Sequence, residues 1–368
     1  MSPSVVVALD SFKGTISAAD AVAELAAGWG SAGAVDAVLR PMADGGEGTI
    51  EAFATAVAGA ERHQVRVTGP AGDPVEASWL LLPGTDDAPR GTAVVELAST
   101  SGIELLGERR LGLDADTTGF GQAIAAALDH GVSRLLLGIG SSASTDGGTG
   151  MLTALGARFL DAGGDPVARG ARGLADIVTA DLGALRAAPD VRVLTDVTNP
   201  LTGPRGAAAV FGPQKGLTAP EDIARVDDAL AHLAALLPVD PELPGTGAAG
   251  GTGAALVRWG GVLAPGAAEV AALIDLAGAV RGAGVVITGE GSYDGQSGDG
   301  KVPSFLAALA AEAGARPLLA AGRIADDADA GLFTRAVSLT ALAGSSAAAV
   351  ADPARWLRVA GAELARSR

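Results

Sequence analysis

The feature that most constrains the fold is an alternation of strand, loop and helix patterns at both ends of the chain. Residues 4–9 and 35–39 are apolar runs typical of buried strands, and a polar loop and a helix pattern follow each of them. Further strand patterns occur at 285–287, 317–320 and 336–339. Repeated strand–helix units predict a parallel sheet. We therefore predict one Rossmann-like, doubly wound sheet built from both chain ends, with strand order 2-1-3-4-5.

The central part of the chain has a different pattern. Short extended runs at residues 65–67, 75–82 and 92–97 are separated by Gly, Pro and Asp, which predicts a β-meander. We therefore predict a second, mixed-sheet α/β domain over residues 62–281, inserted into a first domain that comprises residues 1–61 and 282–368.

Composition limits the chemistry and the partners. The chain contains 0 Cys and 3 His, so disulfides and thiolate sites are excluded and a His-rich metal centre is not expected. The net charge of −16 argues against nucleic acid and anionic membranes as partners. We see neither a membrane-spanning run nor a signal peptide. The expectation is a cytoplasmic protein, a monomer or homodimer, that acts on small molecules.

One stretch places a carboxylate at the end of a buried strand. Asp196 follows the apolar run at 191–194, and the turn after it is broken at Asn199 and Pro200. Polar groups just beyond strand ends commonly form the active sites of α/β proteins. Other carboxylates have the same kind of position, namely Asp10, Asp44, Glu47, Asp146, Glu290 and Asp294. Oxygen ligands without His or Cys suit Mg²⁺.

The three lysines of the chain all lie in loops with glycine: Lys13, Lys215 and Lys301. Arg is far more frequent here, so these positions favour a compact point charge. Lysines and Mg²⁺ offset the charge of phosphate groups, and a carboxylate can accept the proton of an attacking hydroxyl. The residues therefore predict phosphoryl transfer, with Lys13 and Lys301 on phosphate groups or on the substrate carboxylate.

We expect Asp196 to be the general base or the group that orients the acceptor hydroxyl. Asn199 would hold the substrate or this carboxylate, and Lys215 would bind the substrate's carboxylate or a phosphate. The opposite assignment is also open, in which Asp294 is the base and Asp196 binds Mg²⁺.

Two glycine patterns suggest other functions. Residues 295–301 match G-x-x-x-x-G-K of a P-loop but lack its final Ser/Thr, whose hydroxyl would hold Mg²⁺. Residues 138–143 match the G-x-G-x-x-A dinucleotide pattern, although Asp146-Gly147-Gly148 interrupts the place of its helix. The alternatives to a kinase are thus a nicotinamide-dependent dehydrogenase of a small hydroxy acid and a non-catalytic small-anion binding protein.

Several of these motifs, in the same order, resemble the glycerate kinase family, the class of the bacterial glycerate 2-kinases. The matching blocks run through nearly the whole chain, at residues 10–14, 43–49, 196–201, 211–216, 247–251, 288–291 and 294–301. The resemblance implies ATP- and Mg²⁺-dependent phosphorylation of D-glycerate, at the 2-hydroxyl to give 2-phosphoglycerate. It also implies two α/β domains with the active site in the cleft between them.

The family motifs extend the set of expected site residues. Catalytic roles are expected for Asp196, Lys13 and Lys301, and metal binding for Asp294 and Glu290. Substrate binding is expected for Ser11, Asp44, Glu47, Asn199, Lys215 and Gln296. Nucleotide binding is expected for Gly289, Gly291, Gly300, Gly250, Gly251 and Ser142. Two departures from the family pattern, Ser141 and the Ser144-Thr145 pair, are small polar replacements that bear on substrate preference.

Overall fold

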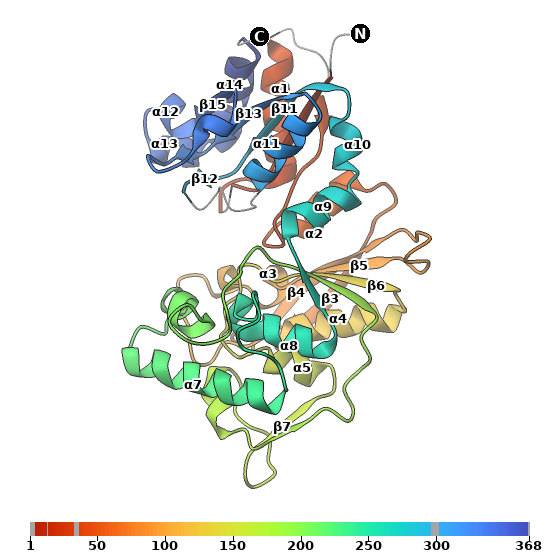
Figure 1. Cartoon of the computed structure of the whole chain (residues 1–368), viewed down its shortest axis with the longest axis vertical. Helices are drawn as coiled ribbons and strands as arrows, with labels where there is room; N and C mark the ends of the chain where they lie inside the picture. Colours follow the sequence, from red (N-terminus) through yellow and green to blue (C-terminus); the bar gives the residue numbers. More distant parts are fainter. Residues whose placement is uncertain (1–3, 13, 33–36, 296–301, 367–368) are drawn as a thin grey trace. The chain divides into compact units, whose positions relative to one another are not determined.

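The computed structural model describes residues 4–12, 14–32, 37–295 and 302–366 (Figure 1). Contacts divide the chain into two compact units. The first unit contains Met1–Asp44, Glu51–Ala58 and Pro265–Arg368, and the second contains Gly45–Ile50 and Gly59–Ala264. The first unit thus begins its C-terminal part at Pro265, earlier than the predicted boundary at 282. That the two units are separate domains stays a prediction.

The first unit is built on a five-stranded parallel sheet made from both chain ends. Its strands are β1 (Ser4–Leu9), β2 (Ala37–Leu39), β11 (Ala283–Gly289), β13 (Arg316–Ala321) and β15 (Arg335–Ser338). They lie in the order β15-β13-β11-β1-β2, and every neighbouring pair is parallel. The predicted order 2-1-3-4-5 is confirmed. Its switch point, where β1 pairs with β11, is the usual place for a ligand in such a sheet.

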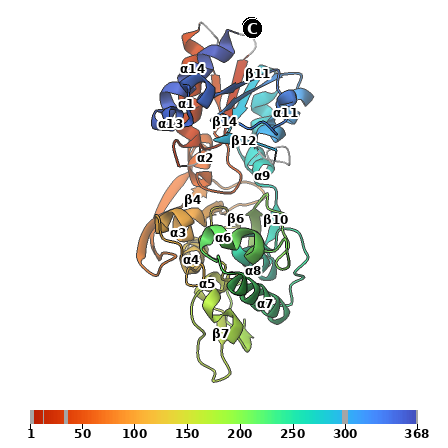
Figure 2. The ribbon, with the colours of Figure 1, turned by 90° about the vertical axis from the view of Figure 1, so that its left-hand side faces the viewer.

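Small residues let the first and last helices of this unit pack closely. Helix α1 (Ala18–Ser31) starts at Ser17, whose side chain accepts a hydrogen bond from the Asp20 amide. It lies beside α14 (Pro353–Ala365) in both views (Figure 1, Figure 2). A Cβ atom at Gly28 would collide with the Arg358 carbonyl, and one at Gly361 with the Leu25 carbonyl. Only glycine permits these backbone contacts.

Several shorter elements complete the first unit. They are α2 (Thr49–Ala56, which starts in the second unit), α9 (Gly266–Leu273), α10 (Leu276–Val280), β12 (Ser292–Tyr293), α11 (Val302–Glu312), β14 (Arg323–Ile324), η5 (Ala330–Leu332), α12 (Leu339–Ala343) and α13 (Ser346–Ala351).

The second unit has a six-stranded mixed sheet in the order β10-β9-β6-β5-β4-β3. The predicted meander is present as β3 (Glu61–Thr68), β4 (Pro74–Leu82) and β5 (Thr92–Glu96), which pair antiparallel. The other strands, β6 (Arg134–Gly138), β9 (Asp190–Leu194) and β10 (Val262–Ala264), continue from β5 with parallel pairing. The carboxyl ends of β5, β6, β9 and β10 therefore share one edge of the sheet.

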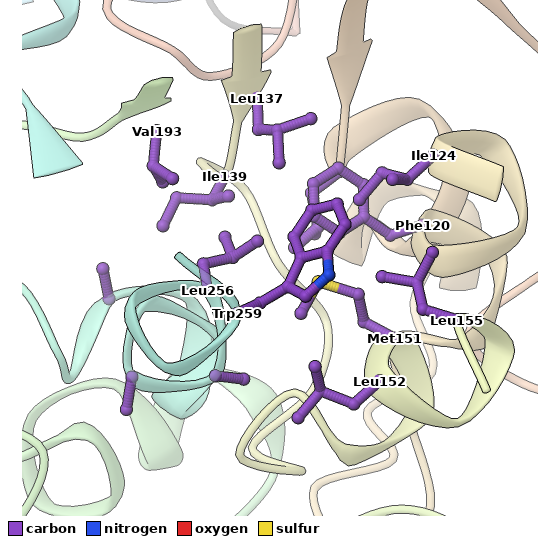
Figure 3. Close-up of a cluster of buried hydrophobic side chains, with 14 of the residues drawn as sticks. Phe120, Ile124, Leu137, Ile139, Met151, Leu152, Leu155, Val193, Leu256 and Trp259 are labelled. Carbon is purple, nitrogen blue, oxygen red and sulfur yellow. The ribbon is translucent and has the colours of Figure 1, made fainter. Parts of the chain in front are cut away.

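The core of the second unit lies between this sheet and its helices. Helices α4 (Thr118–His130), α5 (Thr149–Ala154) and α8 (Thr252–Trp259) contribute Phe120, Met151 and Trp259 to one buried cluster (Figure 3). The remaining elements are α3 (Ala98–Ser101), η1 (Ile103–Leu106), β7 (Arg158–Leu160), η2 (Ala171–Asp176), β8 (Thr179–Asp181), η3 (Ala207–Phe211), α6 (Gly212–Lys215), α7 (Pro220–Leu236) and η4 (Ala248–Gly251). Within the described ranges, no helix has the length and apolar character needed to cross a membrane.

Candidate functional site

The first unit has a cavity of about 440 Å³ at the carboxyl ends of its parallel strands. Asp10 and Ser11 follow β1, Glu290 and Gly291 follow β11, and Arg323 follows β13. The last helices add apolar residues to the lining, Leu339, Ala349, Val350 and Pro353, beside the hydroxyls of Thr340 and Ser346. One cavity thus combines carboxylates with apolar residues.

Five residues expected at the site from sequence lie together around this cavity: Ser11, Asp44, Glu290, Gly291 and Asp294. Gly289 ends β11 just before them, and a Cβ atom there would collide with the Ala320 carbonyl. The close packing of β11 against β13 therefore explains why residue 289 is a glycine. Four further expected residues, Lys13, Gln296, Gly300 and Lys301, lie outside the described residues.

Ser11 presents an unusual polar atom to this cavity. Its hydroxyl is buried, and it has no hydrogen-bond partner among the parts of the chain that the structure describes. Its amide, by contrast, donates to Asp10 Oδ1 at 2.6 Å. A buried hydroxyl without a partner costs free energy, and Ser11 is one of the residues that line the cavity.

The donor set of this cavity suits a magnesium ion that is shared with phosphates. Its carboxylates come from Asp10, Asp44, Glu290 and Asp294. Within the described residues, no three or more His, Cys, Asp or Glu side chains form a cluster that could enclose a metal ion. Mg²⁺ in kinase sites needs only one or two carboxylates, because waters and substrate phosphates supply its other ligands. Glu290 and Asp294 therefore fit the ion chemically.

In the second unit, the loop after β6 is shaped by backbone contacts. A Cβ atom at Gly138 would lie 2.6 Å from the Gly45 carbonyl oxygen, and one at Gly140 would lie 2.6 Å from Gly46 Cα. The Gly140 amide donates to the Gly45 carbonyl at 3.0 Å. The two glycines of the G-x-G-x-x-A pattern thus accommodate another loop of the chain.

No dinucleotide-binding helix follows this pattern. Ser141 has a left-handed backbone with φ 59°, and the next helix, α5, begins only at Thr149. A dinucleotide fingerprint needs a helix that starts directly in the glycine turn, so that its amino end faces the pyrophosphate. The geometry thus argues against the nicotinamide alternative.

Lys215 is buried behind this loop. Only 3% of the residue is exposed, and Nζ donates to Ser142 Oγ at 2.7 Å and to the Ser144 carbonyl at 2.6 Å. Burial lowers the pKa of Lys215 to about 7, and the charge of Asp146 opposes this shift. The ammonium group therefore holds the loop and its Ser142 hydroxyl from inside the protein.

Asp146 anchors the same loop. It is fully buried, and Oδ2 accepts hydrogen bonds from the Thr117 hydroxyl at 2.7 Å, the Thr117 amide at 3.0 Å and the Gly150 amide at 3.2 Å. Oδ1 accepts from the Ser144 hydroxyl at 3.1 Å and the Gly148 amide at 3.2 Å. Burial raises the pKa of Asp146, and the nearby charge of Asp116 raises it further.

Two glycines from another segment, Gly250 and Gly251, pack against the loop that Asp146 anchors. Gly250 and Gly251 have φ 67° and 92°, and the Gly250 carbonyl accepts a hydrogen bond from the Gly147 amide at 3.0 Å. A Cβ atom at Gly250 would collide with the Ser144 carbonyl. The two glycines expected to bind nucleotide thus pack against the loop that carries Ser142 and Asp146.

Asp196 lies two residues beyond the end of β9 and is half-buried. Nearby, the Asn199 side-chain amide donates to the Arg205 carbonyl at 2.8 Å, and its backbone carbonyl accepts from Gly245 and Gly247. Asn199 therefore fixes the turn that follows Asp196. Glu47, also expected at the site, is exposed in the second unit.

Sequence reasoning missed one buried carboxylate at the same sheet edge. Glu96 is the last residue of β5, and its Oε1 accepts a hydrogen bond from the Ile50 amide at 2.6 Å. Burial raises its pKa to about 7, against the hydrogen bond from Ile50. In the sequence, the signal that could have indicated Glu96 is a single acidic residue at the end of an apolar strand pattern.

The comparisons with known proteins agree with this geometry. The model of the glycerate kinase family matches residues 5–368. The chain is 40% identical to the glycerate 2-kinase of Escherichia coli (strain K12), with 88% of this chain and 86% of that protein covered. It is 39% identical to the glycerate kinase of Bacillus subtilis (strain 168), with 89% and 86% covered. A crystal structure assigned to glycerate kinase 2 of Salmonella typhimurium LT2 superposes with a TM-score of 0.83 at 36% identity, covering 100% of this chain and 98% of that one.

Proposed function

Because the chain belongs to the glycerate kinase family, and is a kinase, we propose that it transfers the γ-phosphoryl group of ATP to the 2-hydroxyl of D-glycerate, with Mg²⁺. The family match supports glycerate as the acceptor. The observation that supports a Mg²⁺–nucleotide complex is the cavity of the first unit, whose lining combines Glu290, Asp294 and Ser11 with apolar residues.

The cavity has the chemistry that a nucleotide requires. Its apolar residues suit a base, and its carboxylates and hydroxyls suit ribose and a phosphate-bound cation. Mg²⁺, when bound, supplies positive charge to the phosphate oxygens. Glu290 and Asp294 would hold it, and Lys13 and Lys301 would offset the remaining phosphate charge.

Asp196 has the role of general base in this proposal. The 2-hydroxyl oxygen of glycerate forms the new bond to the γ-phosphorus, and the bond from that phosphorus to the ADP oxygen breaks. The proton of the hydroxyl passes to the Asp196 carboxylate and from there to water. Asn199 orients the turn of Asp196 through its hydrogen bond to Arg205.

Lys215 has an indirect role. Its ammonium group is buried and bonded to Ser142 and Ser144, so we propose that it positions the Ser142 hydroxyl for the carboxylate of glycerate. The same buried positive charge would favour an anion at the surface of that loop.

Product analysis of the full chain tests this function. The protein is incubated with ATP, Mg²⁺ and either D-glycerate, L-glycerate or a panel of other hydroxy acids, and ADP release is measured. Phosphorus NMR then identifies the ester. We expect ADP release with D-glycerate and a 2-phosphate ester; a 3-phosphate ester would refute the 2-position, and ADP release with only another acid would refute glycerate. Reduction of NAD⁺ without ADP release would support the dehydrogenase.

A further inference from the structure

The second unit contains another cavity, and none of the residues expected at the active site lines it. Its volume is about 270 Å³. Its apolar lining residues include Phe159, Leu160, Pro166 and Val167. Its polar and charged lining residues are Thr118, Thr149, Thr153, Asp116, Arg158 and Arg169.

The two arginines outnumber the one carboxylate of the lining, Asp116, so the cavity has a net positive charge in a strongly acidic protein. Arg158 is exposed and takes part in none of the ion pairs or side-chain hydrogen bonds found among the described residues. Arg169 binds the buried carboxylate of Asp116 through Nε, and its terminal nitrogens donate no hydrogen bond within the described part of the chain. Guanidinium groups bind carboxylates and phosphates through pairs of parallel hydrogen bonds.

We propose that this cavity binds a small organic anion, a phosphate or carboxylate group on a short carbon chain, and that its occupancy inhibits the kinase. Arg158 and the terminal nitrogens of Arg169 bind the anionic group. The threonine hydroxyls and the wall formed by Phe159 and Pro166 surround the carbon chain. A volume of about 270 Å³ is at the lower limit of small-molecule sites, which restricts the ligand to a compact acid.

One residue that lines this cavity, Gly150, also holds Asp146. Gly150 donates its amide to Asp146 Oδ2 at 3.2 Å. Asp116, which binds Arg169, directly precedes Thr117, whose hydroxyl donates to the same oxygen at 2.7 Å. Arg169 is therefore joined to Asp146 through Asp116 and its neighbour Thr117.

The hydrogen bonds between the cavity lining and Asp146 give the reason why a bound anion would inhibit the kinase. An anion on the terminal nitrogens of Arg169 competes with the bond from Nε to Asp116, and so disturbs the neighbouring Thr117, whose amide and hydroxyl hold Asp146. Asp146 in turn accepts a hydrogen bond from Ser144, whose carbonyl holds the Lys215 ammonium group. A bound anion therefore disturbs the loop that carries Ser142 and Ser144, and with it the proposed binding of the acceptor's carboxylate. Inhibition rests on the proposed function, whereas binding of the anion does not.

The test uses phosphoenolpyruvate and malonate as probes, with binding to the full chain measured by calorimetry in the absence of substrates. We expect the wild type to have a probe site that depends on Arg158, separate from any binding to the active site, which also takes carboxylates and phosphates. Arg158→Met removes one cation, and Thr153→Phe adds bulk at an exposed position of α5, so each should weaken probe binding at least tenfold. Arg90→Met is the matched control, because Arg90 is an exposed arginine of the same unit that does not line the cavity. It should bind the probes as the wild type does.

Kinetics then separate the two parts of the proposal. Without probe, Arg158→Met should have the kcat and KM of the wild type; with probe, the wild type should lose activity and Arg158→Met should retain it. Equal probe affinity in wild type, Arg158→Met and Thr153→Phe, or no binding of either probe at millimolar concentration, would overturn the site. Binding that depends on Arg158 but leaves turnover unchanged would overturn the inhibition alone. A chain without glycerate kinase activity would refute the proposed function and leave the calorimetric result standing.

Discussion

The two units both place polar side chains at the carboxyl ends of parallel strands, but they use them differently. In the first unit, Ser11 faces a cavity, and its buried hydroxyl has no partner among the described residues. In the second unit, the Ser142 hydroxyl accepts a hydrogen bond from the buried Lys215 ammonium group at 2.7 Å. Ser11 thus lines a cavity in which we propose a ligand, whereas the Ser142 hydroxyl bonds within the protein interior.

The comparison has a thermodynamic consequence. A polar group that bonds to the protein contributes to folding, and its removal leaves its partner unsatisfied. A polar group that faces a cavity contributes nothing to folding until a ligand arrives. Substitutions in the cavity of the first unit should therefore change binding, whereas substitutions in the buried network of the second should change both stability and catalysis.

The largest effect is expected for Lys215→Met, which removes the buried charge and keeps a side chain of similar length. We expect kcat/KM for glycerate to fall by about two to three powers of ten, as for loss of one preorganised electrostatic group. The KM for ATP should stay within about twofold, because the proposed nucleotide cavity belongs to the other unit. The unfolding free energy should also fall by about 1–3 kcal/mol, because the Ser142 hydroxyl and the Ser144 carbonyl lose their buried donor. Steady-state kinetics with each substrate varied, together with urea unfolding, measure these quantities. An equally large rise in the KM for ATP would contradict the assignment of the two substrates to different units.

A pH effect on stability is expected from Glu96. Its pKa is raised from 4.5 to about 7 in the folded protein. Between these values the folded state holds a proton that the unfolded state has lost, so stability falls as pH rises, by up to about 3 kcal/mol in all. Below pH 4.5 both states are protonated, and above pH 7 the full loss is present. Glu96→Gln should therefore gain stability relative to the wild type between pH 5 and pH 8.

Urea unfolding at several pH values checks this prediction. Glu104→Gln is the control, because Glu104 is an exposed glutamate of the same unit. Its stability curve should follow that of the wild type. Parallel curves for Glu96→Gln and the wild type would show that the burial of Glu96 has no cost.

The smallest effects are expected for the two serines, and their contrast sharpens the comparison. Ser142→Ala leaves the Lys215 ammonium group with one partner fewer, so stability should fall by about 1–3 kcal/mol. Ser11→Ala removes a hydroxyl without a protein partner, so stability should stay the same or rise, while the KM for ATP rises about fivefold. Thermal unfolding and initial rates on both variants test this. Equal losses of stability would mean that both hydroxyls serve the fold.

Sequence predicted the parts of the structure that depend on local pattern. The order of the five parallel strands followed from the alternation of strand and helix, and the carboxylates Asp10, Asp44 and Glu290 could be placed at strand exits because of the polar loops that follow the strand patterns. Contacts between distant segments could not be predicted in this way. Gly138 and Gly140 resemble a dinucleotide turn in sequence, but they are glycines because residues 45–46 pack against them.

The burial of Lys215 was not predictable either. A lysine in a Gly-rich loop is usually solvated, and only the contacts of its ammonium group with Ser142 and Ser144 show that it is buried. Glu96 and Asp116 were missed because each is a single acid whose burial is fixed by tertiary contacts, to Ile50 and to Arg169.

The central claim is that Asp196 acts as the base and that Asp294 holds the metal ion. A Mg²⁺ titration of turnover in the wild type, Asp196→Asn and Asp294→Asn tests it most directly. We expect Asp294→Asn to need more Mg²⁺ for half-maximal activity and to recover turnover in excess Mg²⁺. Asp196→Asn should keep the Mg²⁺ requirement of the wild type and lose about 10²–10⁴-fold in kcat at saturating Mg²⁺. Recovery of Asp196→Asn in excess Mg²⁺, with no such recovery in Asp294→Asn, would contradict the account and exchange the two roles.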